Sequence, residues 1–128
     1  MAAIRSINTK PEIYVRKALH AAGFRFRLHR ANIPGKPDII LPRYKAAVFV
    51  HGCFWHGHGC KSDHQPHTNK PYWTAKIQRN IERDARNLNA LEDAGWRTAI
   101  VWECSIETMT NQLIVELRLI RDSKAHDA

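Results

Sequence analysis

Eight consecutive residues, Cys53-Phe-Trp-His-Gly-His-Gly-Cys60, constrain the fold more than any other part of the sequence. The run brings two thiols and two imidazoles close together, and these are ligands that Zn²⁺ prefers in proteins. Cys104 supplies a third thiol, so a tetrahedral Cys₃His zinc site is predicted, with a metal-free cluster of reduced thiols as the alternative. Spacing alone does not decide which histidine ligates. His58 is two residues before Cys60, and this choice leaves His51 and His56 for other work.

Length, cysteine content and charge limit the class of protein. With 128 residues the chain is expected to form one domain over residues 1–128. It has no apolar stretch long enough to span a membrane and no signal-peptide pattern, so we expect a cytoplasmic protein. Within the cytoplasm we expect a monomer associated with the nucleoid. In that reducing compartment three cysteines favour metal ligands or free thiols over disulfides. The net charge of +8 favours a polyanionic partner such as nucleic acid, although solvated lysines alone would give the same charge.

The spacing of apolar residues predicts three helices and four strands in one α/β domain, with a mixed central sheet flanked by helices. Segments 31–36 and 61–72 are read as a Pro-Gly turn and an irregular loop. The expected helices are Lys10–Ala22, Trp73–Ala94 and Ile106–Ile120, and the expected strands are Phe24–His29, Pro37–Leu41, Ala46–Val50 and Thr98–Trp102.

The first helix begins with a capping box, Thr9-Lys-Pro-Glu12, in which Thr9 is the N-cap and Glu12 occupies the third helical position. Glu12 also lies on the same stripe as Val15 and Leu19. Two roles are therefore open for Glu12. It can serve only in the capping box, or its carboxylate can also point at the sheet and belong to the functional site.

Asp84 interrupts an apolar stripe of the long helix. A buried, unpaired carboxylate is costly, of the order of the ~3–5 kcal/mol lost when a buried ion pair is broken. A partner is therefore expected, either an arginine such as Arg43 or a histidine or metal. The imidazoles of the Cys53–Cys60 run favour histidine. The apolar positions that surround Asp84 are Ile77, Ile81, Leu88 and Leu91.

Asp38 follows Pro37 at the start of a strand. This pair often does no more than open a strand or turn. However, a carboxylate at a strand edge, beside the end of a neighbouring strand, is where hydrolytic Mg²⁺ sites are built. The backbone carbonyl of Val50 and the side chain of His51 are expected at the same place, which predicts a magnesium site.

Three aromatic residues are candidates for contact with a partner. Phe54 and Trp55 are neighbours in a glycine-containing segment, so both cannot easily face one core. Burial in the core is the commonest fate of such rings, and it remains the alternative for these two and for Trp73. In a basic protein, exposed rings suit base stacking or insertion between base steps.

Five strings together resemble the very-short-patch-repair (Vsr) DNA mismatch endonuclease family. They follow one another in the family's order between about Asn8 and Cys104. The resemblance implies a divergent PD-(D/E)-x-K nuclease fold, and this chain likewise lacks the usual acidic and lysine pair on its third strand. The strings are Pro34-Gly-Lys-Pro-Asp38, Phe49-Val-His-Gly-Cys-Phe-Trp-His56, Ile81-Glu-Arg-Asp84, Gly95-Trp-Arg97 and Val101-Trp-Glu-Cys104.

The resemblance also implies catalytic roles. Asp38 would bind Mg²⁺ together with the Val50 carbonyl. His56 would act as general base on the attacking water, oriented by Asp84. The side chains that would support the phosphate and the metal are His51 and Glu12.

By the same resemblance, Cys53, His58, Cys60 and Cys104 would hold the structural zinc ion. The wedge entering the duplex beside the mismatch would comprise Phe54, Trp55 and Trp73.

The activity implied is a Mg²⁺-dependent nick on the 5′ side of the mismatched T in a T·G pair of double-stranded DNA, which starts very short patch repair of deaminated 5-methylcytosine. One alternative is a nuclease of the same fold with another mismatch or DNA target. The other is a zinc-stabilised DNA-binding module without catalysis, against which Asp38, His56 and Asp84 argue because binding alone requires none of them.

Overall fold

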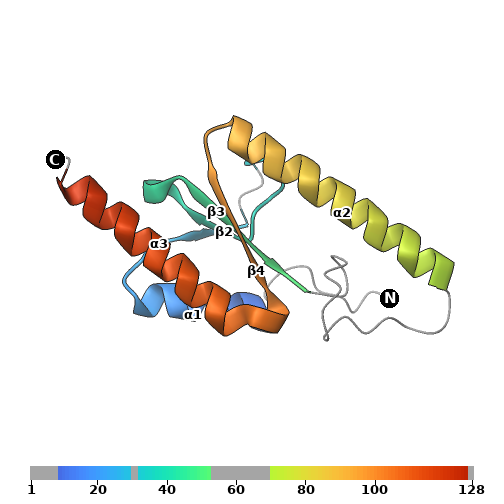
Figure 1. Cartoon of the computed structure of the whole chain (residues 1–128), viewed down its shortest axis with the longest axis horizontal. Coiled ribbons are helices and arrows are strands. Elements are labelled where there is room, and N and C mark those ends of the chain that lie inside the picture. Colours follow the sequence, from blue (N-terminus) through green and yellow to red (C-terminus); the bar gives the residue numbers. More distant parts are fainter. Residues whose placement is uncertain (1–8, 30–31, 53–69, 127–128) are drawn as a thin grey trace.

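A computed structural model describes residues 9–29, 32–52 and 70–126 (Figure 1). Within these ranges the predicted order of helix, three strands, helix, strand and helix is confirmed. The elements are α1 (Lys10–Ala21), β1 (Arg27–Leu28), β2 (Ile39–Leu41), β3 (Ala46–His51), α2 (Lys70–Asp93), β4 (Arg97–Trp102) and α3 (Ile106–His126), with short 3₁₀ turns η1 (Pro42–Tyr44) and η2 (Glu103–Ser105).

The predicted mixed sheet is also confirmed. Its strand order is β1-β2-β3-β4, with antiparallel pairing between β1 and β2 and between β2 and β3. Strands β3 and β4 are parallel, in a register that runs from Ala46 opposite Arg97 to His51 opposite Trp102. Parallel strands end at the same edge of a sheet, so the segments that follow His51 and Trp102 leave from neighbouring points.

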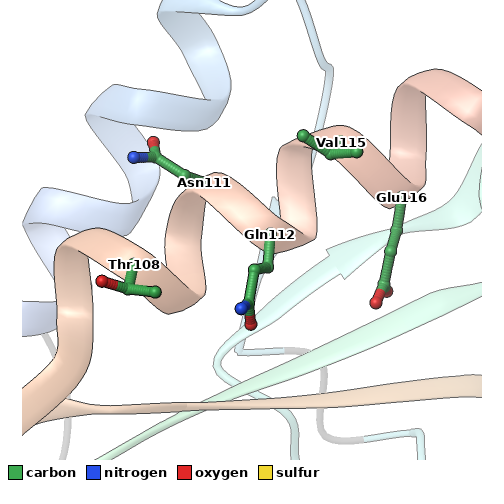
Figure 2. Close-up of a pocket in the computed structure, with 5 residues that line it drawn as sticks. All are labelled: Thr108, Asn111, Gln112, Val115 and Glu116. Atoms are coloured by element: carbon green, nitrogen blue, oxygen red, sulfur yellow. The ribbon is translucent and has the colours of Figure 1, made fainter.

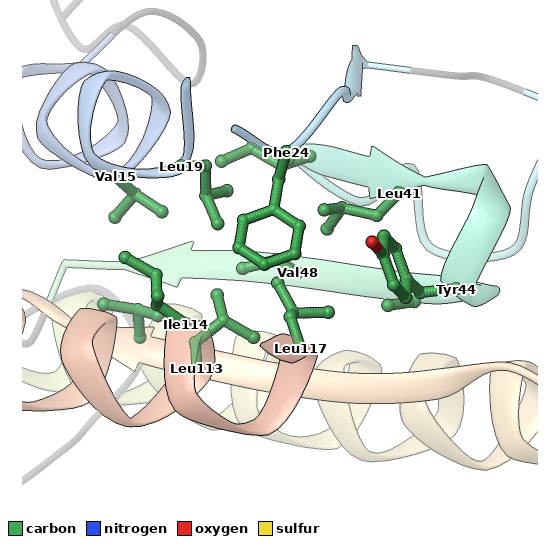
Figure 3. Close-up of a cluster of buried hydrophobic side chains, with 12 residues drawn as sticks. Val15, Leu19, Phe24, Leu41, Tyr44, Val48, Leu113, Ile114 and Leu117 are labelled. Atoms are coloured by element: carbon green, nitrogen blue, oxygen red, sulfur yellow. The ribbon is translucent and has the colours of Figure 1, made fainter. Parts of the chain in front are cut away.

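Helices cover both faces of the sheet, with α1 and α3 on one side and α2 on the other (Figure 1). Successive side chains of a strand point to opposite faces. In β3, Val48 accordingly packs in the core under α1 and α3, whereas Ala47 and Phe49 pack with Leu91 of α2. Figure 3 shows the larger core, whose side chains include Leu19, Phe24, Leu113 and Leu117.

The element boundaries differ from the prediction by one or two residues at most places, and by more at three. The first strand has only two paired residues, because its partner β2 is only three residues long and offers just Ile39 and Ile40 as register partners. Helix α2 begins at Lys70, inside the predicted loop, since Pro71 is tolerated in a first helical turn. Helix α3 continues past Ile120 to His126, because the apolar spacing marks only the part of the helix that packs.

Among the described residues, no helix is both long and apolar enough to cross a membrane.

The turn that leads into β2 requires glycine for two reasons. Gly35 has φ +77°, and a Cβ built on it would lie 2.8 Å from the Cβ of Asn87 on α2. The Gly35→Ala variant should therefore lose stability through the left-handed backbone, about 1–2 kcal/mol, and through overpacking, about 1–3 kcal/mol. Chemical denaturation measures the loss.

Gly23→Ala is the matched control. Gly23 also has positive φ, +88°, but a Cβ there would meet nothing within 4 Å. The Gly23→Ala variant should therefore lose only the stability that the left-handed backbone costs, about 1–2 kcal/mol. Equal losses in the two variants would contradict a close contact between the turn and α2.

Candidate active site

Three ionisable side chains meet beneath the start of α1. Glu12, His29 and Asp38 each offer one metal-ligating atom, and these atoms all lie within 4.8 Å of one another. Glu12 comes from the first turn of α1, His29 directly follows β1, and Asp38 directly precedes β2. The three segments are joined by turns, so the cluster is a product of the fold rather than of a local motif.

Glu12 is placed by both its backbone and its side chain. The Thr9 hydroxyl accepts a hydrogen bond from the Glu12 N–H at 3.4 Å, so the N-cap half of the predicted capping box is confirmed. The residue is 1% exposed, and its carboxylate contacts the Arg16 guanidinium and, at 2.8 Å, Nε2 of His29. A buried carboxylate is tolerated when charged hydrogen-bond donors surround it. The carboxylate of Glu12 therefore belongs to the cluster, and its backbone belongs to the cap.

The side chain of Asp38 extends the hydrogen bonding between β2 and β3 by one bond beyond the last pair of backbone partners. The register ends at Ile39 opposite Val48, and the Val50 N–H then donates to Oδ2 of Asp38 at 2.7 Å. The sequence placed Asp38 beside Val50, and the structure does the same. The N–H and C=O of one residue in a strand lie on the same edge. The Val50 carbonyl thus faces the side on which Asp38 lies.

His51 lies elsewhere. It is 5% exposed, and it follows Phe49 by two residues on the face covered by α2. Its ring is 5.7 Å from the Phe49 ring and 5.1 Å from the Trp102 ring. Among the described residues, the Glu12–His29–Asp38 cluster does not include His51.

Asp84 is half-buried, and the apolar stripe around it is only partly a core stripe. Leu91 is fully buried and Ile77 nearly so, but Ile81 is 38% exposed, so its predicted place in the core is wrong. Helix α2 packs on the sheet through Leu88 and Leu91, and Ile81 belongs to neither hydrophobic core cluster of the described residues. The cost of burying Asp84 is therefore smaller than the sequence pattern indicates.

Several predicted site residues lie outside the described residues. These are Cys53, Phe54, Trp55, His56, His58 and Cys60, together with the side chain of Trp73. The fourth predicted zinc ligand, Cys104, is exposed in η2, immediately after β4.

His29 is the member of the cluster that the sequence prediction missed. The alternation over residues 24–29 indicates an outward-facing polar residue at the end of a strand. Instead its φ is +47°, and the left-handed backbone ends the strand pattern at this residue. Its position just before the turn that leads to Asp38 was the available signal.

A second feature, a shallow hollow on α3, lies apart from this cluster (Figure 2). Glu116 is its only ionisable lining residue, so it offers no acid and base pair for catalysis. The lining side chains are Thr108, Asn111, Gln112, Val115 and Glu116.

Residues 1–62, which contain the whole cluster, match the family model described as DNA mismatch endonuclease Vsr. The chain is 48% identical over 122 residues to a type II nicking enzyme of Xanthomonas oryzae pv. oryzae, covering 95% of this chain and 89% of that protein. A type II nicking enzyme of Neisseria meningitidis serogroup A is 46% identical, with 94% and 84% covered. The protein named DNA mismatch endonuclease Vsr of Escherichia coli is 39% identical, with 91% and 76% covered.

The Glu12–Arg16 ion pair should contribute measurably to stability. Arg16→Met keeps the aliphatic packing and leaves the buried carboxylate with His29. Since the Arg16 side chain is 17% exposed and one partner remains, the loss should lie near the low end of the ~3–5 kcal/mol typical of a broken buried pair. Urea denaturation measures it.

The control variant removes a solvent-exposed hydrogen bond between residues that are also four positions apart on a helix. Gln78→Met abolishes the 3.3 Å hydrogen bond to Glu82 on the surface of α2 and should change stability by less than ~0.5 kcal/mol. If both variants are equally stable, Glu12 does not depend on Arg16.

Proposed function

The chain belongs to the DNA mismatch endonuclease Vsr family and is a DNA endonuclease; we propose that it nicks duplex DNA on the 5′ side of the mismatched T in a T·G pair. Such a nick starts very short patch repair of deaminated 5-methylcytosine. The observation that carries the proposal is the meeting of Glu12 and Asp38, on separate elements, within the part of the chain that matches the family.

The catalytic metal is proposed to be Mg²⁺, held by Asp38 and the backbone carbonyl of Val50. Carboxylate and carbonyl oxygens are the hard ligands that this ion prefers. The fit is supported by the hydrogen bond from the Val50 N–H, which fixes the Asp38 carboxylate beside the end of β3. When bound, Mg²⁺ polarises the scissile phosphate and stabilises the charge that develops on it. Glu12 lies next to this position and is proposed to orient the phosphate and the water near it.

The proton of the attacking water needs a base, and here the proposal depends on the family resemblance. His56 is assigned as general base and Asp84 as the carboxylate that orients it. The resemblance also assigns His51 to the phosphate; it lies near the end of β3, packed against Trp102 and outside the Glu12–His29–Asp38 cluster. General-base catalysis typically contributes about 10²–10⁴ to a rate, so this pair is a major part of the proposed mechanism.

The structural zinc site is proposed to comprise Cys53, His58, Cys60 and Cys104. The strand register supports it, since His51 pairs with Trp102, and in the sequence Cys53 and Cys104 each follow that pair by two positions. Two residues span at most about 7 Å of chain. The two thiols therefore start from adjacent strand ends, and an ion joining them would fix the edge of the sheet next to the catalytic residues.

A basic stripe on α2 supports double-stranded DNA as the partner. Arg79, Arg83 and Arg86 are exposed at spacings of four and three, which places them on one face of the helix. Leu88 and Leu91 pack on the sheet from a different face. The stripe suits the regularly spaced phosphates of a DNA strand. The wedge beside the mismatch is proposed to be Phe54, Trp55 and Trp73.

Another DNA target for the same nuclease chemistry is the second candidate. Two relatives more similar than the Escherichia coli protein are named type II nicking enzymes, and their names specify no mismatch. The two candidate functions share the nicking reaction and differ only in the DNA that is cut.

A nicking assay tests the proposal directly. End-labelled duplexes that differ in one T·G pair and in its flanking bases are incubated with Mg²⁺, and the nicked strand and position are read from a sequencing gel. Cutting 5′ of the mismatched T, with paired duplexes left intact, is the expected result. Equal cutting of paired duplexes would favour the second candidate.

Asp38→Asn separates catalysis from binding. The variant should abolish Mg²⁺-dependent nicking, while its affinity for the mismatched duplex stays within about tenfold, or 1.4 kcal/mol, of wild type. Binding is measured by fluorescence anisotropy at fixed salt, because phosphate contacts are salt-dependent. If the variant nicks at the normal rate, the metal site lies elsewhere.

The zinc proposal predicts about one bound zinc per purified chain by elemental analysis. Cys104→Ala should lose both the metal and cooperative folding, because binding of a structural zinc contributes directly to folding. The neighbouring Ser105→Ala is the control, and it should keep both. A stable, folded chain without zinc would refute this site.

A further inference from the structure

His29 connects the two acidic residues of the candidate site, through its ring to the side chain of Glu12 and through its backbone to the backbone of Asp38. Its Nε2 lies 2.8 Å from Oε2 of Glu12, and its backbone N–H donates to the backbone carbonyl of Asp38 at 3.3 Å. Glu12 belongs to a helix, whereas Asp38 precedes a strand on the other side of a turn. A single residue is therefore hydrogen-bonded both to the Glu12 carboxylate and to the backbone of Asp38.

A second contact of Glu12 is the ion pair with Arg16. Arg16 lies one turn further along the same helix, so this pair joins two residues of α1. It offsets the charge of the carboxylate. The contact from His29, in contrast, runs between α1 and the strand edge.

The backbone of His29 is held in an uncommon conformation. Its φ of +47° is in the left-handed region, which residues other than glycine rarely adopt. Such a conformation persists only where surrounding contacts over-determine it, and it is frequent at functional sites. Here it allows the N–H to reach Asp38 while the ring reaches Glu12.

We propose that His29 is a positioning residue of the catalytic site, which holds the Glu12 carboxylate beside Asp38 and thereby sets the affinity of the site for its divalent cation. The proposal rests on the function proposed above. Two carboxylates at this separation repel each other, and the hydrogen bond from His29 prevents Glu12 from turning away. Residues that orient carboxylates around a metal typically change its affinity by about 10–100-fold when they are removed.

Direct ligation by His29 is the competing role. An ionised carboxylate only accepts hydrogen bonds, so Nε2 carries the hydrogen in its contact with Glu12. Nε2 then has no lone pair for a metal, so ligation by His29 would have to come from Nδ1, which is not the atom that contacts Glu12. The geometry therefore favours positioning over ligation.

The test measures Mn²⁺ binding to the purified full chain without DNA, by the electron paramagnetic resonance signal of the free ion. His29→Gly removes the ring and, since glycine adopts positive φ readily, adds no backbone strain. It should weaken Mn²⁺ binding at least tenfold. His29→Gln, whose amide can also donate to Glu12, should recover most of that affinity. His20→Ala, at an exposed histidine in the last turn of α1, is the matched control and should bind as wild type.

Two results would overturn the inference. If His29→Gly binds Mn²⁺ as wild type does, His29 does not position the site. If His29→Gln binds Mn²⁺ as weakly as His29→Gly does, a hydrogen-bond donor to Glu12 does not determine the affinity. Ligation by the imidazole would then replace positioning as the role of His29. Circular dichroism melting of each variant verifies folding, and a variant that binds weakly only because it is unfolded also counts against the inference.

Asp38→Asn distinguishes this inference from the function on which it rests. If that variant loses both Mn²⁺ binding and nicking while His29→Gly retains them, only the role of His29 fails. If Asp38→Asn binds Mn²⁺ and nicks normally, the proposed metal site itself is wrong.

Discussion

The hydrogen bond between the Val50 N–H and the Asp38 carboxylate is the interaction on which the arrangement of the site depends. Strand β2 has three residues and β3 has six, so β3 continues beyond its antiparallel partner. At that point a side-chain oxygen replaces the backbone carbonyl that a longer β2 would supply. The same contact completes the pairing of the two strands and orients the proposed metal ligand. Strand pairing and the proposed metal site therefore share one hydrogen bond.

Apolar packing brings the second carboxylate to this point. Val15 and Leu19 are fully buried on one stripe of α1, and Glu12 lies on the same stripe one turn earlier. Packing of the stripe against α3 and the sheet thus buries Glu12 as well. Removal of apolar surface from water supplies the driving force. The ion pair with Arg16 and the hydrogen bond from His29 offset the cost of desolvating the carboxylate.

The sequence predicts the order of the elements and the place of Asp38 because both are encoded locally, in apolar spacing, caps and a Pro-Asp pair. It does not predict His29, whose role depends on a left-handed backbone and on contacts with two distant segments. Nor does it predict the exposure of Ile81, which lies one turn after the buried Ile77, because apolar spacing along a helix does not show which of its turns are covered by other parts of the chain. The assignments on Cys53–Cys60 remain predictions from sequence, since that run lies outside the described residues.

The close approach of Gly35 to Asn87 has a mechanical consequence. The turn that leads to Asp38 rests against α2, the helix that carries the basic stripe, with no room even for a methyl group between them. A tilt of α2 toward the turn, such as a docked polyanion could impose, is therefore transmitted to the backbone next to Asp38. The turn and the helix therefore cannot move toward each other independently, and the position of α2 constrains the backbone that leads to the proposed metal ligand.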